Sequence, residues 1–562
     1  MSDFFQDPPR LENTYRSNRW LRSYLRTKLP AAAFATVDAD LDKLGVSCAG
    51  PYLALARQAE REKPVMVHFD PWGRRVDEVR VSRAWLDLQD IAAREGMVAH
   101  GYKREFGEYS RLYQFAKLYL FHPSSAFFTC PLAMADGAAK VLETHGTDDA
   151  HRDAFKHLTS TNPAEFWTSG QWMTEKTGGS DVSETGTRVE FEDGKARLYG
   201  TKWFSSATTS AIALALARCP DSPAGSRGLT LFMAKTYARP GELNNIRVLR
   251  LKDKLGTWAL PTAELSLEGT YAVQVGARDQ GVKTVASMLN ITRLYNSVCS
   301  IGQHERALDM LRDYSGRRTV FGQKLNDQPL HYSTFADEEL KALAGFALTF
   351  ELVHLLGKEE AKTASAGESE ILRLMTPVCK LLTARQAIQG ASEVIEGFGG
   401  AGYIEDTGIP VHLRDSQVFP IWEGATNVLS LDMIRVLQKS NALGALKEDV
   451  TARLKASSKP GLEPFVQSLQ SALHALEAGL GEWMKAPADA QIASARSLAF
   501  HLGRLYSGVL LVGWAARENE ANRQHLIPWL DHFMKSYLGL WSPMGSDDIQ
   551  RRRKMWSERL QS

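Results

Sequence analysis

A single carboxylate stands among apolar residues in the segment 419–427, which reads FPIWEGATN. Glu423 follows Phe, Ile and Trp and precedes Gly424, and an amphipathic helical pattern begins directly afterwards. A carboxylate in apolar surroundings loses hydration, which favours its protonated form and raises its pKa. A raised pKa suits a general base that takes up a proton near neutral pH. These residue types therefore fit a catalytic base; the alternative is a helix-capping loop whose Glu faces water.

Three other segments have side chains suited to a flat, phosphorylated ligand. The segment 173–182, MTEKTGGSDV, places hydroxyls around two glycines, so that exposed backbone N–H groups could hold a phosphate or a flavin edge. The segment 200–207, GTKWFSSA, pairs two aromatic residues with hydroxyls that could bond a ring edge. Arg318 ends a helical pattern, where paired donors suit a diphosphate. The alternatives are a polar turn, a strand with one buried aromatic residue and an ordinary helix end.

A GxGxxG pattern at Gly397, Gly399 and Gly402 does not predict a nicotinamide site. The residues before it have a helical pattern, and Gly408 and Pro410 interrupt any helix after it. A Rossmann site needs a strand, a glycine turn and a helix in that order.

Composition excludes several classes of protein. A chain of 562 residues is too long for one core, so several domains are expected. The net charge of +2 gives no strong attraction to nucleic acid or acidic membranes. Five dispersed cysteines without a CxxC pair argue against disulfides and zinc, so we expect no metal and a reducing, cytoplasmic location. The N-terminus lacks the form of a targeting signal, and no apolar run reaches the about 18 residues of a membrane span.

The periodicity of apolar residues changes along the chain in a way that predicts an α+β fold, mostly α. Residues from about 76 to 160 have helical spacing, and residues 189–199 alternate around an Asp-Gly pair, which predicts a hairpin. Further strands are expected over 211–217, 229–233, 246–251 and 262–267. Helical spacing returns from about 286. We therefore expect domains over 1–164, 165–285, 286–440 and 441–562.

The order and spacing of these segments resemble the acyl-CoA dehydrogenase family over roughly residues 90 to 440, and its AidB branch of alkylation-response flavoproteins in particular. The shared segments are MTEKTGGSDV at 173–182, KWF with a following Ser at 202–206, RLKDKLG at 250–256 and IWEG at 421–424. The resemblance implies an N-terminal helical domain, a middle β-barrel or sandwich domain and a C-terminal four-helix bundle. Residues 441–562 would form an extra helical extension.

The resemblance also implies an activity: FAD-dependent α,β-dehydrogenation of an acyl-CoA thioester, with a fatty acyl chain, to a 2-enoyl-CoA. Glu423 would take the α-proton while the β-hydride passes to the flavin, and Arg293 would lie near the substrate. A homotetramer and an electron acceptor such as electron-transfer flavoprotein are implied as partners. FAD would contact two groups of residues. One chain would supply Met173, Thr174, Gly179, Ser180, Phe204, Ser206, Trp422, Thr426 and Asn427. A neighbouring subunit would supply Arg318, Phe321, Gln328, Glu396, Gly399 and Gly400.

Two rival functions remain: an AidB-like flavoprotein with a DNA-binding or protective role, and a relative that holds an acyl lipid without turnover. The extension has fifteen Lys or Arg against twelve Asp or Glu, a weak basic footprint for a DNA-binding domain. DNA binding is therefore possible but not favoured. We interpret residues 252–254 as a solvated β-turn and residues 551–554 as a charged terminus.

Overall fold

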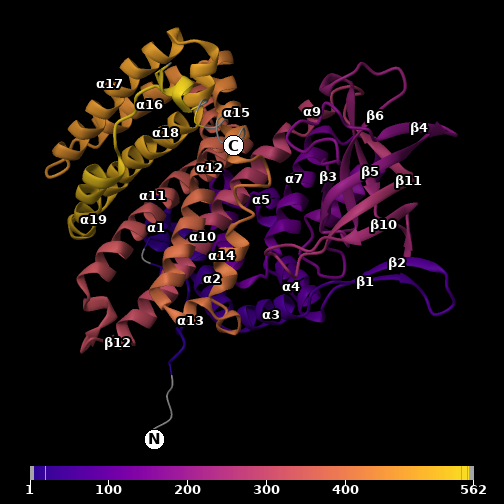
Figure 1. Ribbon diagram of the computed structural model, residues 1–562, viewed down its shortest axis with the longest axis horizontal. Coiled ribbons are helices and arrows are strands. Elements are labelled where there is room, and N and C mark those ends of the chain that lie inside the picture. Colours follow the sequence, from indigo (N-terminus) through magenta and orange to yellow (C-terminus); the bar gives the residue numbers. More distant parts are fainter. Residues whose placement is uncertain (1–5, 19, 546, 553–554, 556–562) are drawn as a thin grey trace, which may run out of the picture.

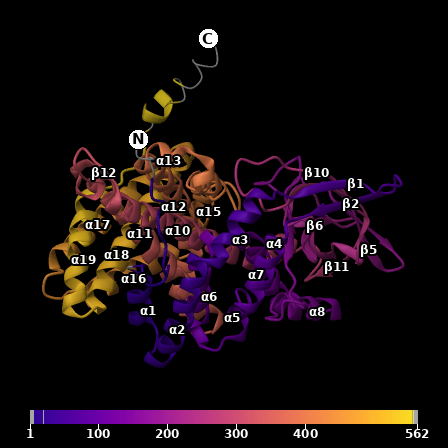
Figure 2. The ribbon, with the colours of Figure 1, turned by 90° about the horizontal axis from the view of Figure 1, so that it is seen from below.

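The protein has three lobes, with a helical bundle between a β domain and a second helical lobe. Figure 1 shows this arrangement in the computed structural model, and Figure 2 shows the same order from below. The structure describes residues 6–18, 20–545, 547–552 and 555. The predicted fold class, mostly helical with a middle β domain and a helical extension, is confirmed.

The N-terminal region is mostly helical, as predicted, but it also contains a hairpin. Its helices are α1 (Leu21–Lys28), α2 (Ala31–Ala49), α3 (Pro51–Arg61), α4 (Arg83–Arg94), α5 (Ala99–Lys103), α6 (Ser110–Phe121), α7 (Thr129–His145) and α8 (Asp149–Leu158). The hairpin pairs β1 (Val65–Phe69) with β2 (Arg75–Arg80), so residues 76–80 are strand and not the start of a helix. A partner distant in sequence explains the difference, because Asp77 accepts a hydrogen bond from the Val248 N–H at 3.1 Å.

The middle domain is built on a seven-stranded sheet. Its strands are β3 (Ser169–Trp172), β4 (Arg188–Glu192), β5 (Lys195–Ser206), β6 (Ile212–Arg218), β7 (Leu229–Lys235), β10 (Ile246–Leu251) and β11 (Thr262–Val275). A short hairpin, β8 (Tyr237–Arg239) with β9 (Glu242–Leu243), lies beside it. The predicted hairpin is confirmed: Asp193 and Gly194 have φ of 51° and 74°, which places the turn in the left-handed region.

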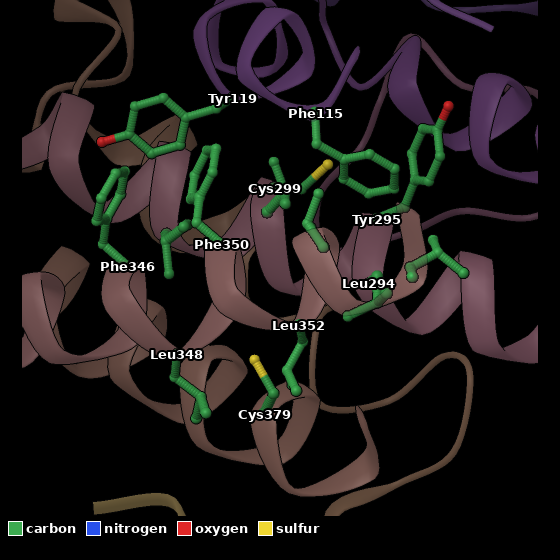
Figure 3. Packing of buried hydrophobic residues seen from close by; sticks show 14 of the residues in the cluster. Phe115, Tyr119, Leu294, Tyr295, Cys299, Phe346, Leu348, Phe350, Leu352 and Cys379 are labelled. Carbon is green, nitrogen blue, oxygen red and sulfur yellow. The ribbon is translucent and has the colours of Figure 1, made fainter. Parts of the chain in front are cut away.

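Four helices enclose the core of the bundle: α10 (Ala286–Arg317), α11 (Pro329–Glu360), α12 (Ala366–Phe398) and α15 (Thr426–Lys439). Figure 3 shows how aromatic and aliphatic side chains of α10 and α11 interdigitate with Phe115 and Tyr119 of α6. Short elements close the ends: α9 (Gly281–Thr284), β12 (Thr319–Val320), β13 (Gln323–Lys324), α13 (Gly400–Tyr403) and α14 (Pro410–Ser416). Long helices packed on both sides give the bundle a rigid frame for the loops between them.

The C-terminal extension buries the apolar stripes that its sequence contains. It comprises α16 (Ala442–Ala456), α17 (Glu463–Lys485), α18 (Ala488–Arg517) and α19 (Glu520–His532). Helix α18 packs against α11, α12 and α15 of the bundle. Helices α11 and α18 have the length and hydropathy of a membrane span, but 89% of each such window is buried in the fold. Packing against neighbouring helices therefore accounts for their apolar character. Part of the charged segment 551–554 lies outside the described residues.

Residues 252–258 join the middle domain to the helices, which corrects the interpretation of residues 252–254 as a solvated β-turn. Lys254 is largely buried and donates to the Thr257 and Leu260 carbonyls at 2.7 Å each. The Lys252 ammonium lies 3.2 Å from the centre of the Trp203 ring. The Trp258 ring contacts two cations from different domains, the Lys63 ammonium at 3.6 Å and the Arg414 guanidinium at 3.9 Å.

Two carboxyls from different elements are buried together beside this joint. Asp415 of α14 accepts a hydrogen bond from the Thr257 N–H at 2.6 Å, and Glu60 of α3 lies near it. Burial, and then the charge of Asp415, hold the pKa of Glu60 well above its usual range. Such a carboxyl supports the fold fully below its unfolded pKa and loses that contribution as the pH rises through its folded pKa.

Replacing Glu60 with Gln should therefore stabilise the protein in a pH-dependent way. We expect the gain in melting temperature of Glu60→Gln over the wild type to grow between pH 5 and pH 8. At pH 8 the corresponding gain in the free energy of unfolding should be at least about 1.4 kcal/mol, the free energy of one pKa unit. The exposed Glu62→Gln is the matched control and should show no such trend. A gain that does not change with pH would show that ionisation of Glu60 does not limit stability.

Candidate active site

Glu423 lies in a tight left-handed turn between α14 and α15. Its φ is 56°, and Gly424 follows with a φ of 106°. A non-glycine residue in this region costs about 1–2 kcal/mol, so the surroundings must hold it there. They do so in part through Trp422, the residue directly before Glu423. Its ring lies 5.7 Å from the Phe127 ring, and its indole N–H donates to Asn296 Oδ1.

The Glu423 carboxyl is desolvated, as predicted, yet contacts a hydroxyl donor. Burial raises its pKa above the usual range. Thr292 Oγ1 donates to Glu423 Oε2 at 2.6 Å, which together with the nearby charges of Arg293 and Lys380 offsets part of that rise. The result is a carboxyl that binds a proton more readily than a solvated Glu while one oxygen stays fixed.

Cations from two helices bind the backbone of the same turn. Arg293 of α10 donates from Nε to the Glu423 carbonyl at 3.3 Å, and Lys380 of α12 donates from Nζ to the Gly424 carbonyl at 2.7 Å. Asp432 of α15 neutralises Arg293, with Nη1 to Oδ2 at 2.8 Å. It also accepts from Arg373 Nη2 at 2.9 Å. Three helices thus converge on one turn through charged groups.

The predicted cofactor residues of the middle domain lie close to one another. The Trp203 N–H donates to the Thr174 carbonyl at 2.9 Å, which places the loop 173–182 beside β5. Gly179 passes so close to Thr174 that an added Cβ would meet its methyl group at 3.0 Å. The Phe204 ring is half exposed, and Ser206 Oγ lies 3.1 Å from Thr262 Oγ1. Met173 is half-buried, while Ser180 is exposed on the same loop.

A short path connects this group to Glu423. Thr262, the partner of Ser206, accepts a weak hydrogen bond from Lys254 Nζ at 3.3 Å. The Cys130 thiol lies within electrostatic range of both Lys254 and Glu423: burial raises its pKa, Lys254 lowers it and Glu423 raises it. The structure therefore brings Ser206 and Glu423 to one region. At the start of α15, Asn427 Oδ1 accepts from Arg496 of the extension at 3.0 Å.

The remaining predicted cofactor residues lie at the other end of the bundle. Arg318 follows the last residue of α10, whereas Arg293 lies near its start, so about 38 Å of helix separates them at 1.5 Å per residue. Figure 1 shows β12 and α13 together at this end and α15 at the opposite one. The residues on this end, all exposed or half-buried, are Arg318, Phe321, Gln328, Glu396, Gly399 and Gly400. Within a single chain, these six residues therefore lie far from Glu423.

Sequence reasoning missed four residues that contact the predicted site: Thr292, Lys380, Asp432 and Arg496. Lys380 and Asp432 each stand as a lone charge between apolar neighbours in a helix, which was a usable signal of burial. Nothing near Arg496 in the sequence pointed to the start of α15. In the described part of the chain, no group of three or more His, Cys, Asp or Glu could hold a metal ion.

Four family models match the chain one after another. They are described as the adaptive response protein AidB N-terminal domain, residues 7–162, and the acyl-CoA dehydrogenase middle domain, residues 170–270. The acyl-CoA dehydrogenase C-terminal domain follows at 279–438, and the acyl-CoA dehydrogenase 11 C-terminal domain-like model at 441–528. The last match covers most of the extension.

Known proteins resemble the whole chain as well as its parts. Acyl-CoA dehydrogenase family member 11 of Caenorhabditis elegans is 43% identical over 541 residues, which cover 93% of this chain and 87% of that protein. Putative acyl-CoA dehydrogenase AidB of Escherichia coli K12 is 30% identical over 72% of this chain and 75% of its own length. The crystal structure of C. elegans ACDH-11 in complex with C11-CoA has a TM-score of 0.95 at 40% identity, covering 99% of this chain and 97% of that one.

The charged cluster around Asp432 predicts a large loss of stability on substitution. Asp432→Asn removes the charge that offsets Arg293 and Arg373, and breaking such a pair at a mostly buried site costs on the order of 3 kcal/mol. We expect a clearly lower midpoint in urea unfolding. The control is Asp531→Asn, whose partner Lys535 is exposed, with an expected change within about 0.5 kcal/mol. Equal midpoints for the two variants would contradict this account of the cluster.

Proposed function

We propose that this chain, which belongs to the acyl-CoA dehydrogenase family, oxidises a fatty acyl-CoA thioester to the 2-enoyl-CoA with FAD as its cofactor. The family consists of flavin-dependent oxidoreductases, and the predicted likeness to its AidB branch is confirmed by the matches to AidB. The observation that carries the proposal is the desolvated Glu423 carboxyl, which has a raised pKa and is held in a left-handed turn.

In the proposed reaction, the side chains and backbone of the protein remove the α-proton of the substrate. Because Thr292 occupies Glu423 Oε2, Oε1 is the oxygen that takes the proton. In the described part of the chain the Glu423 N–H has no hydrogen-bond acceptor, so it is available to polarise a thioester carbonyl. A fixed base and a fixed donor on one residue hold the reacting carbon in line. FAD, when bound, supplies the acceptor for the β-hydride.

The residues present fit FAD. The first turn of α15 has no acidic residue, so the N–H groups at Thr426 and Asn427 suit an anionic group. Phe204 offers a half-exposed ring face to a flat cofactor, next to Thr174 and Ser206. At the other end of the bundle, Arg318 supplies a guanidinium for a diphosphate. Gly399 and Gly400 have open space above them, since an added Cβ would meet no atom within 4 Å.

The separation of these two groups supports a site shared between subunits. The distance along α10 prevents Arg318 from reaching the Glu423 end of its own chain. Large apolar side chains are exposed near Arg318: Phe321 at 98%, Leu330 at 86% and Tyr403 at 83%. Such a surface fits burial against a second copy. The proposed assembly is a homotetramer located in the cytoplasm, with an acceptor such as electron-transfer flavoprotein.

A fatty acyl chain is favoured over other acyl groups because the similar C. elegans protein was solved with C11-CoA. The extension supports this enzyme function more than DNA binding, because α18 is buried against the bundle and Arg496 contacts Asn427. An acyl-lipid-binding role without turnover would use the same site and would differ only in the rate of flavin reduction.

Glu423→Gln should separate catalysis from binding. The substitution keeps the shape of the side chain and removes its ability to accept a proton. We expect FAD content to survive and flavin reduction by a saturated acyl-CoA to slow by at least about 100-fold, the usual size of a general-base effect. Anaerobic stopped-flow absorbance measures both. Unchanged reduction kinetics would exclude Glu423 as the base, and a wild type that binds acyl-CoA without reduction would favour the lipid-binding role.

Arg318→Ala should lower the FAD content, because a diphosphate would lose a paired, charge-assisted donor. The flavin-to-protein absorbance ratio after gel filtration measures this content, and the elution volume reports the assembly. Arg239→Ala on the exposed edge of the β domain is the control and should keep full FAD. Stoichiometric FAD in Arg318→Ala would remove Arg318 from the site.

A further inference from the structure

Lys380 is a buried ammonium that forms no salt bridge with a carboxylate among the described residues. Its side chain on α12 is 0% exposed, and its Nζ donates to the Gly424 carbonyl at 2.7 Å. The described carboxylates form no salt bridge with it. Burial of an ammonium costs several kcal/mol unless other charges offset it. The charge of Lys380 or its hydrogen bond must therefore make a contribution that offsets this cost.

The hydrogen bond fixes the backbone that presents Glu423. Glu423 and Gly424 both have positive φ, and their carbonyls are bound by Arg293 and by Lys380 respectively. Consecutive carbonyls held from two different helices leave the turn little freedom. Loss of the Lys380 donor would leave a buried carbonyl unpaired and the turn free to relax.

The charge of Lys380 has Glu423 as its counterpart. Asp432 is already bonded to two guanidinium groups, Arg293 and Arg373. The Cys130 thiol also lies within electrostatic range of Glu423, and Lys254 lies within range of that thiol. Burial lowers the pKa of Lys380 to about 7, while the charge of Glu423 raises it and that of Arg293 lowers it. Lys380 and Glu423 thus form a pair separated by the Gly424 peptide.

We propose that Lys380 is a positioning residue for the dehydrogenation, which holds the Glu423 turn through the Gly424 carbonyl and keeps Glu423 ionised in its desolvated site. The inference rests on the proposed function, because it assumes that Glu423 is the base. These two effects can be separated. A neutral donor at position 380 would keep the hydrogen bond to the Gly424 carbonyl but would no longer favour the ionised form of Glu423.

Three variants of Lys380 distinguish these parts, with flavin reduction by decanoyl-CoA measured from pH 5.5 to pH 9. Lys380→Gln keeps a donor and removes the charge. The acidic limb of its pH–rate profile should therefore move to higher pH by about one unit. At high pH its rate of flavin reduction should lie within about threefold of the wild-type rate. Lys380→Met removes both, so the limb should move and the rate should stay at least about tenfold low at every pH. Lys380→Arg keeps the charge and should keep the wild-type limb. Lys455→Gln, an exposed lysine of α16, is the control.

FAD content and melting temperature, measured for each variant, separate a folding defect from an effect on the turn. An acidic limb in Lys380→Gln that coincides with the wild-type limb would overturn the inference, whatever the change in stability. If Lys380→Met does not fold, the Gln and Arg variants still decide the matter. If Glu423→Gln reduces flavin normally, the proposed base is wrong and this inference falls with it. A slow Glu423→Gln with an unmoved limb in Lys380→Gln refutes this inference alone.

Discussion

The left-handed turn at Glu423 and Gly424 is the constraint on which the helical domain depends. Its backbone is unfavourable in isolation, so it persists only where neighbouring groups hold it. Phe127 and Asn296 hold the Trp422 side chain just before the turn, and charged or hydroxylic groups from α10, α12 and α15 hold the turn itself. Their burial requires the three helices to keep one mutual register. The tight packing of the bundle in Figure 3 is what makes that register unique.

The sequence predicted those parts of the fold and site whose signals are local. The desolvated Glu423, the Asp193–Gly194 hairpin turn and the helix beginning at Thr426 each follow from neighbouring residue types. Lys380 could not be assigned in the same way, because its partner Gly424 lies 44 positions away. The hairpin β1–β2 was missed for a similar reason: its Asp77 is bonded to Val248, in another domain. Local pattern indicates the element, whereas the pairing of distant elements appears only in the fold.

Residues 252–254 show how an incorrect interpretation arises from charge alone. Two lysines around an Asp suggest solvent, yet Lys252 covers Trp203 and Lys254 is bonded to backbone carbonyls. Long lysine side chains bury their methylene groups and place the ammonium where acceptors lie. The result is a polar joint, closed by Trp258 and Asp415, that ties the β domain to the approach to Glu423. The N-terminal, middle and helical regions therefore meet at this segment, through Lys63, Trp203 and Arg414.

The length of α10 sets the distance and the relative orientation of the functional groups at its two ends. One of its ends contacts Glu423 through Thr292 and Arg293, and its other end carries Arg318. Insertion of one residue between them would advance the far end by about 1.5 Å and rotate it by about 100°, which turns Arg318 onto a different face. Neither change is repaired by small adjustments of side chains. The number of residues in this helix is thus fixed by geometry at both ends, so new substrate preferences must come from the loops around it.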